Sequence, residues 1–84
     1  MSEITMYGAD WCGDCRRAKS YFDRFDVAYR YVDLVAQPDQ MNEVLRRTGG
    51  RQIIPVIVFP DGTHLTEPTD AELAEKTAAT LTDV

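Results

Sequence analysis

Hydrophobic positions follow two different periods along the chain, which predicts alternating strands and helices. Residues 4–7 are β-prone and bounded by Gly8, so they predict a first strand. A helix is predicted next, from apolar residues at i, i+3, i+4 and i+7 that would form one buried stripe. The stripe consists of Ala18, Tyr21, Phe22 and Phe25. Residues 27–33 are rich in β-branched and aromatic side chains and predict a second strand.

The second half of the chain continues the alternation. Pro38 suits the first turn of a second helix, and Gly49-Gly50 predicts its end, because glycine readily adopts positive φ. The apolar stripe of this helix is Met41, Val44 and Leu45. Residues 55–59 form a nearly unbroken apolar run, which is typical of a strand buried on both faces.

A hairpin and a last helix complete the pattern. Asp61-Gly62 is a turn signal, and residues 63–66 supply the returning strand. Thr69 and Glu72 have the spacing of a capping box, which predicts the start of a helix. The predicted inner face of that helix is Leu73, Ala74, Thr77 and Leu81.

The order of these elements, β-α-β-α-β-β-α, predicts an α/β fold with one mixed sheet. The first two strands should be parallel through a right-handed crossover, and the last two should form an antiparallel hairpin. Three helices would then cover both faces of four strands. At 84 residues the chain has room for a single domain, so we expect residues 1–84 to form one unit.

The net charge and the distribution of apolar residues exclude several classes of function. Nine basic and fourteen acidic side chains give a net charge of −5, which argues against general binding to nucleic acid or anionic membrane. No apolar run approaches the ~18 residues that a membrane span requires, and the N-terminus lacks the pattern of a signal peptide. We therefore expect a cytoplasmic protein, with monomer as the default state.

The two cysteines form a CxxC motif at the junction of the first strand and the first helix. A helix N-terminus presents free N–H groups and partial positive charge, and both favour a thiolate at Cys12. Cys15 lies one turn further in and should be more shielded. The asymmetry predicts that Cys12 attacks a disulfide and that Cys15 resolves the product by attacking the sulfur of Cys12.

A structural zinc site is the alternative reading of CxxC. Closed zinc sites need four ligands, and this chain offers two cysteines, the single His64 and carboxylates, without a second CxxC. We therefore expect no bound metal and favour redox chemistry. An inert pair of thiols and a cluster shared between two chains remain open from the residues alone.

Three further residues bear on the site. Trp11 directly precedes Cys12 and is interpreted as a wall beside the thiol, with a core aromatic as the alternative. His64 is interpreted as an exposed strand residue. Pro55 begins a strand, so its peptide bond is a candidate for cis geometry, which would turn the backbone of Ile54 towards an extended substrate.

These motifs together resemble the glutaredoxin family, and most of all the mycoredoxins of actinobacteria. The resemblance extends from Ile4 to about Leu81. It rests on Trp11-Cys12-Gly13-Asp14-Cys15, on Ile54-Pro55, on Gly49-Gly50, and on Asp61-Gly62 followed by Leu65-Thr66-Glu67-Pro68-Thr69.

The resemblance implies a thioredoxin fold in which Pro55 is cis and faces Cys12. It also implies reduction of mixed disulfides between proteins and a low-molecular-weight thiol, which is a cosubstrate (mycothiol or glutathione) rather than a bound cofactor. The partners would be S-thiolated proteins or protein disulfides. By resemblance, the small thiol binds at Ile54, Pro55, Thr69 and Asp70.

The chain departs from the common glutaredoxin pattern at three positions. Asp14 stands where an aromatic residue is usual, and its charge should disfavour a thiolate and make the couple more reducing. We therefore interpret Gly13 and Asp14 as redox-tuning residues. Ile53 replaces a common threonine, and Asp10 stands near the place of a usual basic residue, which favours mycothiol over glutathione.

Two other functions are compatible with the same fold. A thioredoxin-like protein would be reduced directly by a flavin reductase and would serve ribonucleotide reductase, but the chain lacks the Trp-Ser-Gly-Phe-type segment of such redoxins. A dimer could instead carry a [2Fe–2S] cluster on Cys12 of each chain. Gly13 permits that arrangement, whereas Asp14 adds negative charge beside an anionic cluster.

Overall fold

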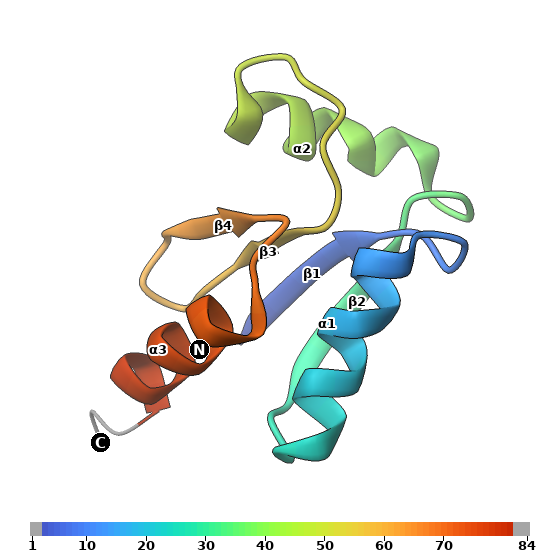
Figure 1. The fold of residues 1–84 in the computed structure, drawn as a ribbon. Helices are drawn as coiled ribbons and strands as arrows, with labels where there is room; N and C mark the ends of the chain where they lie inside the picture. Colours follow the sequence, from blue (N-terminus) through green and yellow to red (C-terminus); the bar gives the residue numbers. More distant parts are fainter. Residues whose placement is uncertain (1–2, 82–84) are drawn as a thin grey trace.

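A four-stranded mixed sheet forms the centre of the fold, which a computed structural model describes for residues 3–81 (Figure 1). Its spatial order is β2-β1-β3-β4. The strands are β1 (Ile4–Gly8), β2 (Tyr29–Asp33), β3 (Val56–Val58) and β4 (His64–Thr66). β1 pairs with β2 in parallel, while β3 is antiparallel to both β1 and β4. The predicted parallel crossover and C-terminal hairpin are therefore confirmed.

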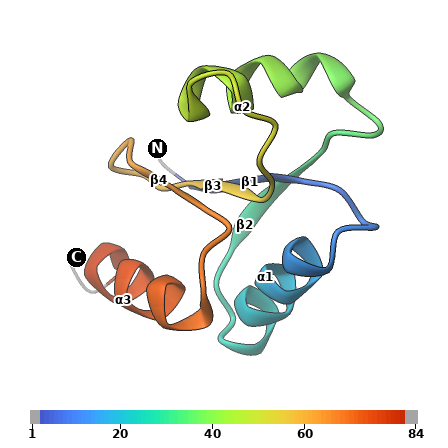
Figure 2. The ribbon, with the colours of Figure 1, turned by 45° about the horizontal axis from the view of Figure 1, so that its top comes forward.

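Helices cover both faces of the sheet, as predicted (Figure 2). They are α1 (Gly13–Arg24), a short 3-10 helix η1 (Pro38–Gln40), α2 (Met41–Thr48) and α3 (Asp70–Leu81). α1 and α3 lie on one face, and α2 lies on the other (Figure 2). Within residues 3–81, no helix is both long and apolar enough to cross a membrane.

The core consists of two apolar clusters, one on each face of the sheet. Alternate residues of β1 point to opposite faces, so Ile4 and Met6 face α1 and α3, while Tyr7 faces α2. The first cluster joins the sheet to α1 and α3 through Ile4, Met6, Cys15, Ala18, Tyr21, Phe22, Ile57, Phe59 and Leu73. The second joins it to α2 through Val32, Leu34, Val44 and Val56. Cys15 is thus part of the first cluster.

The predicted buried stripe of α1 is wrong at its last member. Phe25 is 54% exposed, because α1 ends at Arg24 and the backbone turns away at this C-cap position. The ring of Phe25 packs instead on the ring of Tyr21, with their centroids 4.7 Å apart. The guanidinium of Arg24 also lies over the ring of Phe25, with its Cζ 4.8 Å from the centroid.

The predicted inner face of α3 also needs one correction. Leu73 and Thr77 are buried, as their i, i+4 spacing predicts, but Ala74 is exposed. Ala74 is about 100° further round the helix than Leu73, which places it beyond a narrow contact stripe. The side chain of Leu81 lies outside the described residues.

The second strand begins later than expected from the sequence, whereas the second helix ends where expected. The second strand begins at Tyr29 rather than at residue 27, because the N–H of Val27 donates to the carbonyl of Phe22 in the turn after α1. α2 ends as predicted at a glycine pair: Gly49 and Gly50 both have positive φ, and the N–H of Gly50 donates to the carbonyl of Leu45.

Candidate active site

Cys12 is the N-cap residue of α1 and caps the helix with its own sulfur. Its backbone is extended (φ −84°, ψ 120°), and its Sγ accepts a hydrogen bond from the backbone N–H of Cys15 at 3.4 Å. A sulfur in this position takes the role of the oxygen of an ordinary N-cap residue, next to the positive end of the helix dipole. The half-buried Cys12 is therefore placed where negative charge on sulfur is stabilised.

Cys15 has the opposite environment. Its side chain is fully buried in the core, and this burial, reinforced by the hydrogen bond with Cys12 and by nearby negative charge, raises the pKa of the Cys15 thiol to about 12. At neutral pH Cys15 is consequently a protonated thiol beside the sulfur of Cys12. The predicted difference in shielding between the two cysteines is confirmed.

Gly8 is a residue of the site that sequence reasoning treated only as a strand boundary. It is the last residue of β1 and lies against Cys15, so that a Cβ added at Gly8 would be 2.6 Å from the Cys15 Sγ. The absence of a side chain at Gly8 therefore makes room for the buried thiol. A glycine that ends the strand before a CxxC motif was the available signal.

The acidic side chains near Cys12 are paired with basic or hydroxyl groups. Asp10 accepts a hydrogen bond from the hydroxyl of Tyr31 at 2.9 Å and lies 3.5 Å from Lys19 Nζ. The Tyr31 hydrogen bond, followed by the charge of Lys19, lowers the pKa of Asp10. Asp14 lies 3.4 Å from Nη2 of Arg17. Each of these carboxylates near Cys12 is therefore partly neutralised by a neighbouring cation.

Arg17 links the CxxC helix to the start of α3, a contact that was not predicted from the sequence. Its Nη2 donates to the carbonyl of Pro68 at 3.1 Å, and its Nη1 lies 3.5 Å from Oδ1 of Asp70. The i, i+3 spacing from Asp14 was the only available signal. Arg17 thereby brings Thr69 and Asp70, two predicted thiol-binding residues, to the same side of the sheet as the cysteines.

The start of α3 is closed by the predicted capping box. The hydroxyl of Thr69 accepts from the N–H of Glu72 at 3.1 Å, and the carboxylate of Glu72 accepts from the N–H of Thr69 at 2.8 Å. These two N–H groups are therefore already satisfied. They are consequently not free to bind a carboxylate of a ligand.

The segment before β3 has the expected backbone geometry. The peptide bond between Ile54 and Pro55 is cis. Ile54 is half-buried and packs against both core clusters, and Pro55 is buried. The carbonyl of Pro55 accepts from the N–H of Glu67 at 2.9 Å, which ties this segment to the chain leading into α3.

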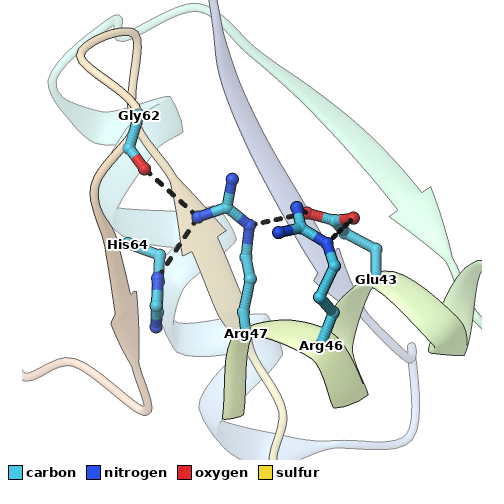
Figure 3. Close-up of polar contacts among 5 residues, drawn as sticks. All are labelled: Glu43, Arg46, Arg47, Gly62 and His64. Carbon is cyan, nitrogen blue, oxygen red and sulfur yellow. Dashed lines mark hydrogen bonds and ion pairs between the residues drawn. The ribbon is translucent and has the colours of Figure 1, made fainter. Parts of the chain in front are cut away.

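Trp11 and His64 have different surroundings. Trp11 is 70% exposed, in agreement with the expected exposed loop and not with a core aromatic. His64 is half-buried rather than exposed, which corrects the prediction. Arg47 is the reason: its guanidinium contacts the Nδ1 of His64 at 3.2 Å and also Gly62 and Glu43, so α2 is joined to the β3–β4 hairpin (Figure 3). His64 thus belongs to a structural contact.

No group of three or more potential metal ligands occurs among the side chains that the structure describes. What the structure does bring together is a capping thiol, a buried thiol one turn later and a cis-proline at the start of the neighbouring buried strand. On a β-α-β-α-β-β-α fold, this arrangement defines a thiol–disulfide site of the thioredoxin-fold class.

Comparison with known proteins identifies the family. The family model described as Glutaredoxin matches residues 4–65. The chain is 35% identical over 80 residues to Mycoredoxin 1 of Corynebacterium glutamicum, which covers 94% of this chain and 98% of that protein. It is 33% identical over 73 residues to a putative glutaredoxin of Mycobacterium tuberculosis, with 87% of each protein covered. The chain therefore belongs to the glutaredoxin family, and it is a thiol–disulfide oxidoreductase.

Solved structures agree with this assignment at the level of the fold. The crystal structure of a glutaredoxin from Archaeoglobus fulgidus matches with a TM-score of 0.73 at 22% identity, covering 96% of this chain and 87% of that one. The predicted thioredoxin-like α/β fold is confirmed.

The contrast between the two cysteines predicts a large difference in their reactivity. Iodoacetamide at pH 8 should modify Cys12 and leave Cys15 unmodified in the folded, reduced protein, because Cys15 is both buried and protonated. Intact mass should show one carbamidomethyl group in buffer and two in urea, and peptide mapping should assign the first to Cys12. Equal modification of both thiols in buffer would contradict this description of the site.

Proposed function

We propose that this protein reduces mixed disulfides between proteins and mycothiol, with Cys12 as the nucleophile and Cys15 as the resolving thiol. The observation that carries the proposal is the capping geometry, in which Cys12 Sγ accepts the N–H of Cys15 at 3.4 Å while the thiol of Cys15 stays buried. The 35% identity to a protein named Mycoredoxin 1, over nearly the whole of both chains, supports mycothiol as the small thiol.

The proposed reaction begins with attack by Cys12. The Cys12 thiolate attacks the sulfur of the small thiol, the mixed disulfide breaks, and the target protein leaves as a thiolate that takes a proton from solvent. Cys12 then carries the small thiol as a new mixed disulfide. A second molecule of small thiol then attacks the sulfur of the bound small thiol, which forms the disulfide of the two small thiols and releases Cys12 as a thiolate. Alternatively, Cys15 loses its proton and attacks the Cys12 sulfur, which releases the small thiol and forms the Cys12–Cys15 disulfide. Since burial holds Cys15 protonated, attack by an external thiol is favoured in this second step.

The residues proposed to hold the small thiol come from three segments of the chain. Ile54 and Pro55 supply backbone groups before β3, and Thr69 and Asp70 lie at the start of α3. Arg17 supports this arrangement, because it contacts Asp70 and the carbonyl of Pro68 from the CxxC helix itself. The exposed ring of Trp11 would form the remaining wall.

Redox tuning and cellular context complete the proposal. Gly13 and Asp14 lie between the cysteines and would set the potential, with the effect of Asp14 moderated by its contact with Arg17. The protein would act in the cytoplasm as a monomer of one domain (1–84), with S-thiolated proteins or protein disulfides as partners and the small thiol as cosubstrate instead of a bound cofactor.

Trapping on the variant Cys15→Ser would test the identity of the thiol. Without Cys15, an adduct on Cys12 cannot be resolved internally, so it should accumulate when the protein meets equal amounts of oxidised glutathione, mycothiol and bacillithiol. Intact mass should show a dominant mycothiol adduct. The double variant Cys12→Ser/Cys15→Ser is the matched control and should show none.

The other results are equally informative. Preferential capture of glutathione would place the protein with glutathione-dependent glutaredoxins. The absence of every adduct would contradict the proposal and favour direct reduction by a flavin reductase.

A further inference from the structure

Arg17 is the one cation among the described residues that lies at once against the CxxC segment and the start of α3. It contacts Asp14 at 3.4 Å, Asp70 at 3.5 Å and the carbonyl of Pro68 at 3.1 Å. The contact with Pro68 spans 51 positions of sequence, so it is a tertiary contact. The guanidinium is always charged, and it is attached to the same helix as Cys12.

Among the described residues, Arg17 is the cation that faces Asp70. Its Oδ1 is shielded from solvent and has no hydrogen-bond partner among the described residues, so the guanidinium 3.5 Å away is the countercharge of this oxygen. The neighbouring acid, Glu72, is occupied by the N–H of Thr69 in the capping box. Asp70 is therefore the acid that a cationic group of a ligand would bind at this helix start, and Arg17 already contacts it.

Arg17, Asp14 and Asp70 together disfavour binding of a ligand group with either a positive or a negative charge. An ammonium must displace or approach Arg17, whose tether gives it a high effective concentration at Asp70. A carboxylate meets Asp14 and Asp70, which share one guanidinium and so leave one net negative charge on the three side chains. A hydroxyl or an acylated amine is uncharged, so it neither competes with Arg17 nor is repelled by this net negative charge.

We propose that Arg17 acts as a built-in counter-ion of Asp70 and thereby makes this subsite select small thiols without a charged group at that end, such as N-acylated, hydroxyl-rich thiols. This proposal rests on the proposed function, because it assumes that the small thiol binds at the start of α3. Arg17 is then a specificity-determining residue for the reaction.

The test compares two substrates that differ in one ammonium group. One cysteine-containing peptide is prepared as a mixed disulfide with glutathione and with N-acetylglutathione, and the second-order rate of peptide release by the reduced protein is measured for each. In Arg17→Gln the ammonium of glutathione can reach Asp70, so the ratio of the two rates should move towards glutathione by about two- to fivefold. The shift should shrink in 1 M salt, where the screening length falls to about 3 Å.

Matched variants separate this effect from net charge and from folding. Arg24→Gln makes the same change of charge at the C-terminal end of α1, about 10 Å along the helix from Arg17, and should leave the ratio unchanged. Arg17→Gln/Asp70→Asn should lose the shift seen in Arg17→Gln. Asp70→Asn alone should change the ratio less than twofold, and this result stands even if Arg17→Gln fails to fold.

The outcomes that overturn the proposal are distinct. An equal shift in Arg24→Gln, an unmoved ratio in Arg17→Gln, or a severalfold selective loss of glutathione use in Asp70→Asn would each overturn it. Release of peptide from both substrates with an unmoved ratio leaves the proposed function intact. The mixed disulfide of the same peptide with mycothiol is the positive control, and no release from it by the unaltered protein would overturn the proposed function and this inference with it. Release from the mycothiol substrate alone, with none from either glutathione substrate by Arg17→Gln, would overturn this inference and leave the proposed function intact.

Discussion

Replacing Cys12 by serine should lower the rate of mixed-disulfide reduction by about 10³-fold or more, the scale of loss seen when an enzyme loses its nucleophile. A serine hydroxyl is a far weaker nucleophile than a cysteine sulfur, and the sulfur at this N-cap accepts the N–H of Cys15 at the positive end of the helix dipole. The measurement is the rate of release of a reporter peptide from its mixed disulfide with mycothiol.

The variant Cys15→Ser provides the contrast. If attack by Cys12 on the small thiol is the productive step, Cys15→Ser should keep a substantial part of the activity with excess free thiol, because the external thiol then releases Cys12. Thermal unfolding should show that Cys12→Ser stays folded, since serine is itself a favoured N-cap residue. Appreciable turnover by folded Cys12→Ser would contradict the assignment of the nucleophile.

Most of the fold could be predicted from the sequence, because its local signals agree with one another. Buried strands alternate with helices of period 3.6, and glycine pairs or Asp-Gly mark the ends of elements, so order and direction followed from elementary rules. Phe25 shows where this reasoning ends. Its spacing is that of a buried residue, but the helix stops one residue earlier, and a periodicity argument does not fix that boundary to a single residue.

The sequence predicts those parts of the candidate site that neighbouring residues of the chain form together. It does not predict the parts that depend on contacts between residues far apart in the chain. The CxxC motif, the helix start and the X–Pro bond are each encoded within a few residues. Arg17 and His64 were not, because their environments are made by partners at Pro68 and Arg47, which only the packing of α3 and α2 brings near. Gly8 is similar, since its significance comes from the thiol of Cys15 that packs against it.

Replacing Gly8 by alanine should destabilise the protein by about 1–3 kcal/mol, the usual range for inserting a methyl group into a filled core. A Cβ at this position would lie 2.6 Å from the Cys15 Sγ and 3.3 Å from its Cβ, and Cys15 is fully buried in the core. For a domain of this size, each kcal/mol corresponds to a fall in melting temperature of roughly 4–8 °C, which circular dichroism would measure. The smaller gain from restricting the unfolded chain, about 0.4–1 kcal/mol, opposes this loss without cancelling it.

Two further variants show whether the clash with the thiol is the cause. Gly13→Ala is the matched control, because its Cβ meets only the Nη2 of Arg16 at 3.9 Å, and it should not lower the melting temperature. Gly8→Ala/Cys15→Ala removes the sulfur that the new methyl group would strike, so it should unfold at a temperature close to that of Cys15→Ala alone. If Gly8→Ala lowered the melting temperature of the Cys15→Ala protein as much as that of the unaltered protein, a clash with the thiol would not be the cause. The loss of stability would then come from strain at the end of β1, because it would persist without the sulfur.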